Sequence, residues 1–173
     1  MSEIIIRKAA INDISAIQKL YQEVAKTEGG IARLQHEIYP DYIEGFVKKS
    51  LTNGLILIAV DNDTIISEIH AYRPGIAVFD HVLTDLTIVV SPEFQGKGIG
   101  KKIFSQFLET VSKEMNRIKR VELIARESNM KAIRFYESIG FTIEGRFENR
   151  IKTTKNTYEA DIPMAWQNPS FQF

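Results

Sequence analysis

The feature that most constrains this chain is a glycine-rich segment between two strongly patterned stretches. Residues 82–90 are apolar and β-branched, which predicts a buried strand. Residues 98–115 place apolar side chains three or four positions apart, which predicts an amphipathic helix. Glycines alternate between the two from Gly96 to Gly100, and a further strand is predicted at 120–126. The segment therefore predicts a strand–helix–strand crossover, which requires at least one parallel pair of strands.

The glycine loop is suited to hold a phosphate group. Glycine lets a ligand approach the backbone closely, and the first N–H groups of a helix have no partner inside it. Lys97, Lys101 and Lys102 add cationic charge. Two common phosphate loops do not fit. Only three residues separate Gly96 from Gly100, and Lys101 stands where a dinucleotide loop has its third glycine. For this motif alone, an ordinary glycine-rich turn stays the alternative.

The rest of the chain predicts a mixed sheet covered by helices. We expect strands at about 4–6, 55–60, 64–72, 141–152 and 157–166, a helix from near Ile14 that Gly29-Gly30 ends, and helices at about 40–53 and 129–139. No repeat or linker interrupts the pattern, so residues 1–173 are expected to form a single domain. The expected fold is α/β, with a mostly antiparallel sheet, one parallel strand–helix–strand crossover and helices on both faces.

Composition argues against several classes of function. The chain has 173 residues, 22 basic and 22 acidic, so no net charge draws it to nucleic acid or to an acidic membrane. Cysteine is absent, which excludes disulfides, a thiol nucleophile and a cysteine-bound metal. The three histidines lack the spacing of a helical metal site, so we expect no metal. No apolar run suits a signal peptide or a membrane span, and we expect a cytoplasmic protein.

Two motifs in the second half of the chain resemble those of a known family. The first is Gln95-Gly96-Lys97-Gly98-Ile99-Gly100, preceded by Val90-Ser91-Pro92. The second is Asn129-Met130-Lys131-Ala132-Ile133-Arg134-Phe135-Tyr136-Glu137-Ser138-Ile139-Gly140-Phe141. In this order and spacing they are similar to the motifs of the GNAT superfamily of N-acetyltransferases. The likeness extends from the first predicted strand to near Trp166 and is weakest between residues 29 and 54.

The resemblance implies acetyl-CoA as the co-substrate and assigns residues to it. The glycine loop would bind the pyrophosphate through backbone N–H groups, and the end of strand 82–90 would pair with the pantetheine arm. Asn129 would contact the cofactor near the pantetheine, and Tyr136 would lie by the sulfur. The residues expected to bind acetyl-CoA are Ile88, Val89, Val90, Gln95, Gly96, Lys97, Gly98, Ile99, Gly100, Lys101, Asn129 and Tyr136.

The implied reaction moves an acetyl group to a primary amine by direct attack in a ternary complex. Such an amine is mostly protonated near pH 7, so the site must remove a proton and stabilise the oxyanion, for which a backbone N–H of strand 82–90 is available. A neutral phenol can protonate a departing thiolate, and this is the role implied for Tyr136. Asp85 is the first candidate for the general base. Further candidates are Glu68, His70 and His81, and a bulge would change which of them faces the site.

The acceptor is expected near residues 27–40, the 72–81 loop and the final hairpin. Candidate lining residues are Tyr39, Tyr42, Tyr72 and Arg73, and candidate partners for a cationic amine are Glu159 and Asp161. We expect a small-molecule amine. Two alternatives stay open, a non-catalytic acyl-CoA sensor and a protein N-terminal acetyltransferase. A homodimer formed through the final hairpin or a sheet edge is compatible with the sequence.

Overall fold

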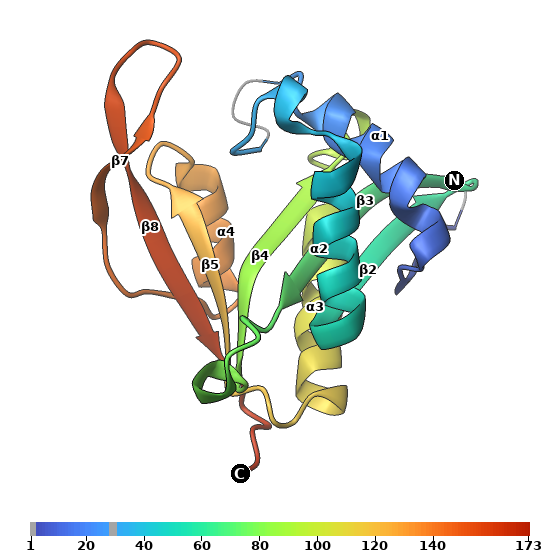
Figure 1. The fold of residues 1–173 in the computed structure, drawn as a ribbon, viewed down its shortest axis with the longest axis vertical. Helices are drawn as coiled ribbons and strands as arrows, with labels where there is room; N and C mark the ends of the chain where they lie inside the picture. Colours follow the sequence, from blue (N-terminus) through green and yellow to red (C-terminus); the bar gives the residue numbers. More distant parts are fainter. Residues whose placement is uncertain (1–2, 28–30) are drawn as a thin grey trace.

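The computed structural model describes residues 3–27 and 31–173 and places them around one eight-stranded sheet (Figure 1). The strands are β1 (Ile5–Lys8), β2 (Gly54–Asp61), β3 (Thr64–Tyr72), β4 (Val82–Val90), β5 (Arg120–Arg126), β6 (Thr142–Ile143), β7 (Phe147–Lys152) and β8 (Tyr158–Gln167). The helices are α1 (Ile14–Val24), α2 (Pro40–Asn53), α3 (Ile99–Glu114) and α4 (Met130–Ser138). The strand order is β1-β2-β3-β4-β5-β8-β6, and β7 pairs with β8. The pair of β4 with β5 is parallel, and the other pairs are antiparallel.

Local sequence explains the hairpin between β2 and β3. Asn62 and Asp63 have φ of 44° and 65°, the left-handed conformation that a tight two-residue turn requires at both central positions. Asparagine and aspartate adopt it more readily than other residues that carry a side chain. Side chains then alternate along β2. Leu57 packs in the core that α3 shares, whereas Ile56 and Ile58 pack in the core formed with α1 and α2.

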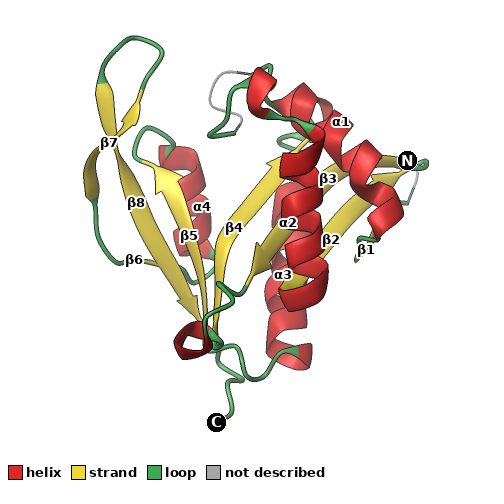
Figure 2. Ribbon diagram, viewed as in Figure 1, coloured by secondary structure: helices red, strands yellow, loops and turns green. Residues whose placement is uncertain are grey.

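Helices cover both faces of the sheet, and each face has its own hydrophobic core (Figure 2). The core under α1 and α2 includes Ile17, Leu20, Tyr21, Ile43, Phe46 and Val47. The core under α3 and α4 includes Ile103, Phe104, Phe107, Val111, Val121 and Ile133. Over the described ranges 3–27 and 31–173, no helix has the length and apolar character needed to cross a membrane.

The parallel strands β4 and β5 meet at one end only. Within the described chain they pair at Val82 with Arg120 and at Leu83 with Val121, and at no other residues. Beyond these pairs the strands diverge, so the sheet opens into a part with β1–β4 and a part with β5–β8 (Figure 1). The facing edges of β4 and β5 therefore lack a neighbouring strand to satisfy their backbone groups.

A bulge in β4 lies beside this opening. The β4 partners of His70 and Tyr72 are Thr87 and Thr84, which leaves one residue more on the β4 side than on the β3 side. Asp85 lies in the bulge and has φ of 54°, a left-handed conformation that is uncommon for residues other than glycine, asparagine and aspartate. The bulge therefore interrupts the regular alternation of side chains next to the opening.

The fold class predicted from the sequence is confirmed, and two of the predicted elements differ. The stretch 141–152 forms two short strands, β6 and β7, which both pair with β8. Pro163 of β8 has no N–H to offer a strand opposite it, which favours a break there. Helix α1 ends at Val24, before the expected stop at Gly29-Gly30, and these two glycines lie outside the described residues.

Candidate active site

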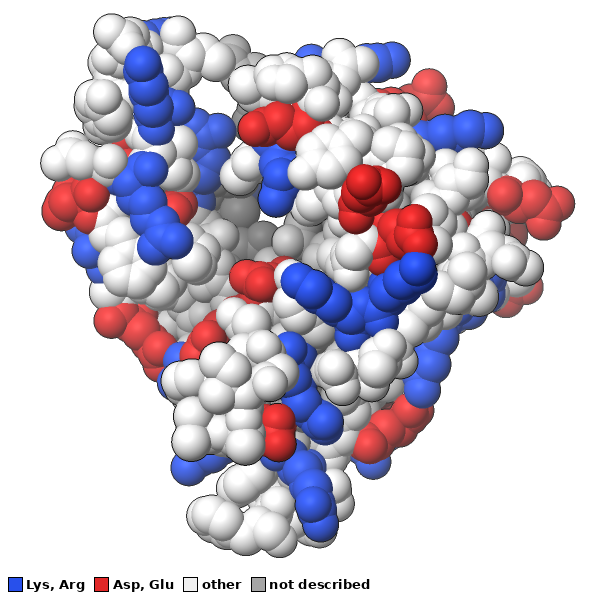
Figure 3. Space-filling view, in the orientation of Figure 1, with Lys and Arg blue, Asp and Glu red and all other residues white. Residues whose placement is uncertain are grey.

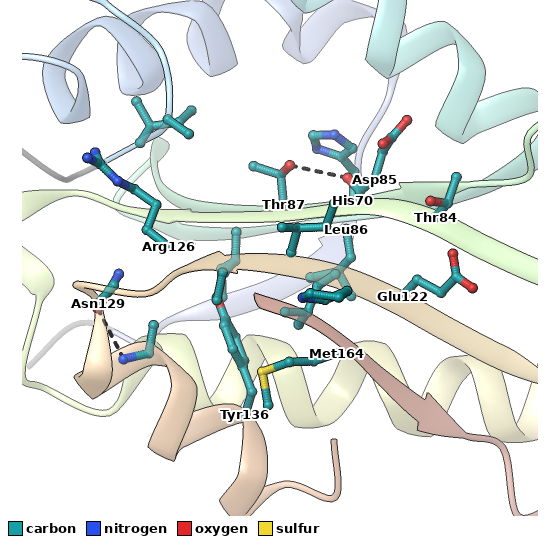
Figure 4. A pocket seen from close by; sticks show the side chains of 18 of the residues that line it. His70, Thr84, Asp85, Leu86, Thr87, Glu122, Arg126, Asn129, Tyr136 and Met164 are labelled. Atoms are coloured by element: carbon teal, nitrogen blue, oxygen red, sulfur yellow. Dashed lines mark hydrogen bonds between the residues drawn. The ribbon is translucent and has the colours of Figure 1, made fainter. Parts of the chain in front are cut away.

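A cavity of about 650 Å³ occupies the opening between the two parts of the sheet. From the β1–β4 part it is lined by residues that include Tyr42, Phe46, His70, Tyr72, Asp85 and Ile88, and from the β5–β8 part by residues that include Glu122, Arg126, Asn129, Tyr136 and Met164. Figure 3 shows a hollow on this face with basic and acidic side chains around it, and Figure 4 shows the lining at close range. A ligand in the cavity would therefore contact both parts of the sheet.

The glycine loop joins the end of β4 to the start of α3. Gly96 and Gly98 have φ of 74° and 80°, a conformation in which a side chain would be strained. The side-chain amide of Gln95 donates a 3.1 Å hydrogen bond to the Val90 carbonyl and folds the loop back on β4. The first bond within α3 runs from the N–H of Lys102 to the Gly98 carbonyl at 3.0 Å. The N–H groups before Lys102 therefore have no acceptor inside the helix.

The residues predicted to bind acetyl-CoA fall into two groups. Ile88, Asn129 and Tyr136 line the cavity, whereas Val90 and the loop from Gln95 to Lys101 do not. Val89 is only 2% exposed because its side chain packs in the core under α1 and α2. Its side chain is thus out of reach of a ligand, and only its backbone remains for pairing.

Tyr136 enters the cavity from α4 and packs among three phenylalanines. Its ring centroid lies 5.7 Å from that of Phe104, 5.6 Å from that of Phe135 and 6.0 Å from that of Phe141. Burial among these rings raises the pKa of Tyr136 to about 12. The hydroxyl therefore stays protonated through the physiological range and is available as a hydrogen-bond donor.

Asn129 has a structural role beside any role in binding. It precedes the first turn of α4, and its side-chain oxygen accepts a 3.1 Å hydrogen bond from the N–H of Ala132 (Figure 4). This bond caps the helix. The side-chain nitrogen is the end of the amide that is left to donate toward a ligand in the cavity.

Asp85 lies in the cavity wall opposite Tyr136, next to Tyr72. Asp85 is exposed and lines the cavity, and Figure 4 shows it beside Thr84 and His70. Burial, followed by a hydrogen bond with Asp85 and its charge, raises the pKa of Tyr72. The Asp85 carboxylate is therefore close to a neutral phenol and has a free path to the cavity.

A buried polar cluster lies behind Asp85. The hydroxyl of Tyr21 donates a 2.6 Å hydrogen bond to one carboxylate oxygen of Glu68, and Nδ1 of His70 lies 3.0 Å from the other oxygen. These three residues, which we call the Tyr21–Glu68–His70 cluster, are at most 2% exposed. Burial and the charge of Glu68 raise the pKa of Tyr21 well above its usual value, so it acts as a neutral donor.

Charged side chains around the cavity are largely paired with one another. Arg120 donates to Glu144 at 2.5 Å, and its Nε lies 2.9 Å from Glu122. Nε of Arg126 donates to Glu159 at 2.7 Å, so Glu159 is engaged by an arginine. The Arg33 guanidinium stacks 3.8 Å from the centre of the Tyr42 ring. The carboxylates of Glu122, Glu144 and Glu159 are thus paired with arginines, and Asp85 is the carboxylate with more freedom to meet a cation.

The predicted acceptor residues are only partly brought together. Tyr42 and Tyr72 line the cavity, whereas the other four predicted residues do not; these are Tyr39, Arg73, Glu159 and Asp161. Sequence reasoning did not single out the lining residues Phe46 and Arg126, and it included Arg33 only within the range 27–40. Glu68 and His70, named as candidates for the base, do carry a signal in the sequence, because they stand among apolar residues of β3. Polar residues in a strand buried on both faces indicate a functional or bonded cluster.

Comparison with known proteins adds two relatives that align over part of their length. The spermine/spermidine N(1)-acetyltransferase of Bacillus subtilis (strain 168) is 34% identical over 59 residues, 34% of this chain and 38% of that protein. The spermidine N(1)-acetyltransferase of Escherichia coli (strain K12) is 34% identical over 65 residues, 38% of this chain and 34% of that protein. The alignments thus span little more than a third of each relative.

Solved structures resemble the fold along nearly its whole length. A GNAT family acetyltransferase from Streptococcus pneumoniae has a TM-score of 0.85 at 20% identity, over 95% of this chain and 99% of that one. The yncA protein from Salmonella typhimurium, solved with its cofactor acetyl-CoA, has a TM-score of 0.83 at 19% identity, over 99% and 98%. The family described as the acetyltransferase (GNAT) domain matches residues 52–143, more than half of the chain. This chain is therefore a member of the GNAT acetyltransferase family.

Proposed function

We propose that the protein transfers an acetyl group from acetyl-CoA to a primary amine of a small molecule. One observation carries the proposal: β4 and β5 diverge around a cavity that has Asp85 on one wall and Tyr136 on the other. A carboxylate that attracts a protonated amine thus faces a neutral phenol that can donate to sulfur. The presence of acetyl-CoA in the structure of the yncA protein supports the same co-substrate here.

The chain's own groups suit acetyl-CoA. The N–H groups at the start of α3, with Gly96 and Gly98 beside them, suit a pyrophosphate because no side chain blocks the approach and the helix dipole favours an anion. The open edge of β4 offers backbone donors and acceptors for an extended amide-bearing arm, as an added strand would use them. Asn129 and Tyr136 complete the site from the β5–β8 side.

The reaction needs two proton movements and no covalent enzyme intermediate. The amine nitrogen bonds to the thioester carbon, and the carbon–sulfur bond breaks. Of the two protons that an ammonium nitrogen loses, one goes to a base and one balances the charge of the thiolate. Asp85 attracts the ammonium group, and a base in the cavity wall takes its proton directly or through one water molecule. Backbone N–H groups released by the β4 bulge are suited to stabilise the oxyanion.

Tyr136 assists mainly as a hydrogen-bond donor to the departing sulfur. Its pKa of about 12 makes it a weaker acid than an exposed tyrosine, so full proton transfer gains less than a charge-assisted hydrogen bond to the thiolate. Tyr136→Phe removes this bond and keeps the ring among its phenylalanine neighbours. We expect kcat to fall by about 10²-fold while the Kd for acetyl-CoA stays unchanged.

The decisive assay mixes the purified protein with acetyl-CoA and a panel of amines and follows free thiol. The panel contains spermidine and spermine, after the names of the two aligned relatives, together with amino acids and a peptide with N-terminal alanine. The chain has no cysteine, so it gives no background signal. Tyr158→Phe, an exposed tyrosine of β8, is the matched control for Tyr136→Phe. Binding of acetyl-CoA without acetylation of any amine would favour the sensor alternative.

A cytoplasmic location and a homodimer stay predictions.

A further inference from the structure

Contacts within the Tyr21–Glu68–His70 cluster fix the orientation of the His70 ring. Nδ1 of His70 lies 3.0 Å and 3.2 Å from the two oxygens of Glu68, and the Tyr21 hydroxyl holds Oε2 from the other side at 2.6 Å. A carboxylate only accepts hydrogen bonds, so the proton of the neutral imidazole sits on Nδ1. Nε2 then carries the lone pair and is the nitrogen free to accept a proton.

The ring of His70 is also held by stacking. The Phe46 ring lies parallel to it at a centroid distance of 4.0 Å with an interplanar angle of 6°, and the Tyr72 ring lies parallel at 6.2 Å and 1°. His70 is 2% exposed, yet it lines the cavity together with Phe46, Tyr72 and Asp85. A base held by two rings and a carboxylate is preorganised, because no rotamer freedom has to be lost during the reaction.

A proton taken up by His70 changes the net charge of the cluster. Glu68 has two neutral donors when His70 is neutral, so the cluster then carries one negative charge in a site with almost no exposure to water. A proton on Nε2 makes an imidazolium–carboxylate pair without net charge. Buried sites disfavour net charge, and a pair that keeps its hydrogen bonds is tolerated better than an isolated ion.

We propose that His70, oriented by Glu68 and Tyr21, takes the proton from the acceptor amine, while the Asp85 carboxylate holds the ammonium group beside it. The proposal rests on the function proposed above and names the base within that site. The N–H bond of the ammonium ion breaks, its electron pair stays on nitrogen for attack on the thioester carbon, and the proton moves to Nε2 of His70. Opening of the product complex returns that proton to water.

Other groups near His70 define what a pH profile reports. Tyr21 from α1 and Glu68 and Tyr72 from β3 contact His70 directly. Tyr42 from α2, Asp85 from β4 and Arg33 from the segment before α2 interact with these three residues. The tyrosines have raised pKa values and stay neutral below about pH 10. The tyrosines therefore do not change charge in the acidic and neutral parts of the profile, and comparison of variants separates His70 from Asp85 there.

The experiment compares kcat/KM across pH for the wild type and for His70→Gln, Glu68→Gln and Asp85→Asn. The probe is spermidine, or the panel amine that the wild type acetylates fastest, and the acetylated amine is quantified by chromatography. For His70→Gln we expect a loss of about 10² to 10⁴-fold at pH 7. Its rate should then rise about tenfold per pH unit toward pH 9.5, because only the amine that is already unprotonated reacts. Recovery at high pH separates a missing base from a damaged fold.

The other variants sharpen the assignment. Glu68→Gln keeps the shape and removes the negative charge that pairs with the imidazolium formed during the reaction, so kcat/KM for the amine should fall. Asp85→Asn keeps a residue type that tolerates the left-handed backbone, and it should raise KM for the amine and leave the shape of the pH profile in place. Glu109→Gln, an exposed glutamate of α3, is the control for Glu68→Gln.

Two results would overturn the proposal. One is a His70→Gln enzyme with the wild-type profile, and the other is a His70→Gln enzyme that stays inactive at every pH, which assigns His70 a structural role. A pH profile that changes shape in Asp85→Asn instead would make Asp85 the base. A wild-type protein that acetylates no amine would overturn the proposed function itself, so the two failures are distinguishable.

Discussion

The hydroxyl of Tyr21 in α1 donates a 2.6 Å hydrogen bond to the carboxylate of Glu68 in β3, and both side chains are fully buried. Tyr21→Phe removes this donor and leaves a buried carboxylate oxygen without it. We expect the free energy of unfolding to fall by about 1–3 kcal/mol, the usual cost of a buried polar group that loses its partner. Urea unfolding measures the change. Tyr158→Phe removes an exposed hydroxyl and should cost much less; an equal loss in both variants would contradict the role of the bond.

Stability should fall at alkaline pH because tyrosines hold their protons in the folded state. Burial is the largest cause that raises the pKa of Tyr21, Tyr42, Tyr72 and Tyr136. In the unfolded chain a tyrosine loses its proton near pH 10. Above that pH the unfolded state binds fewer protons than the folded state, so stability that is complete below about pH 10 declines as pH rises. Urea midpoints between about pH 8 and 11 measure this, and a flat series would contradict it.

Gly98→Ala should weaken acetyl-CoA binding beyond its cost in stability. Gly98 has φ of 80° at the start of α3, and Gly75 has the same φ in the loop between β3 and β4. Neither would place a new Cβ within 4 Å of another group, so both alanine variants carry a similar backbone strain, about 1–2 kcal/mol. Calorimetry should show a Kd for acetyl-CoA raised at least about tenfold in Gly98→Ala only. Equal affinities in both variants would argue against a phosphate site at this loop.

Two glycines, one inside α2 and one directly after it, should change stability in opposite directions when replaced by alanine. A Cβ on Gly54 would lie 2.1 Å from the Ala71 carbonyl oxygen, which is backbone and cannot move aside cheaply. We expect Gly54→Ala to destabilise by more than about 2 kcal/mol. Gly45 lies inside α2, and a Cβ added to it would meet nothing within 4 Å, so Gly45→Ala should stabilise by about 0.5–1 kcal/mol. Thermal unfolding that ranks the two variants in the reverse order would contradict both assignments.

The fold was largely predictable because its signals are local. The Asn62-Asp63 turn, the amphipathic pattern of α3 and the glycines before it each specify their own segment of chain. The break between β6 and β7 was not predictable from such patterns, because it depends on Pro163 of a strand that comes later in the sequence.

The sequence predicted several residues of the candidate site, but it did not predict how they contact one another. Tyr136 and Asp85 could be named from the motif and the strand, and both line the cavity. The bond between Tyr21 and Glu68 joins residues 47 positions apart, and no periodicity encodes such a pairing. The bulge at Asp85 depends on the register between β3 and β4, which the pattern of either strand alone leaves undetermined.

The split between β4 and β5 has a mechanical consequence. Only two residue pairs join β4 to β5 within the described chain. The angle between the β1–β4 part and the β5–β8 part is therefore fixed chiefly by side chains of the core under α3 and α4. Phe104 of α3 is one of these side chains, because its ring packs against those of Phe135, Tyr136 and Phe141 on the β5–β8 side. The volume of these packed side chains therefore sets the width of the cleft. A smaller side chain in place of Phe104 would change that width and lower the rate of catalysis, although Phe104 does not contact a substrate.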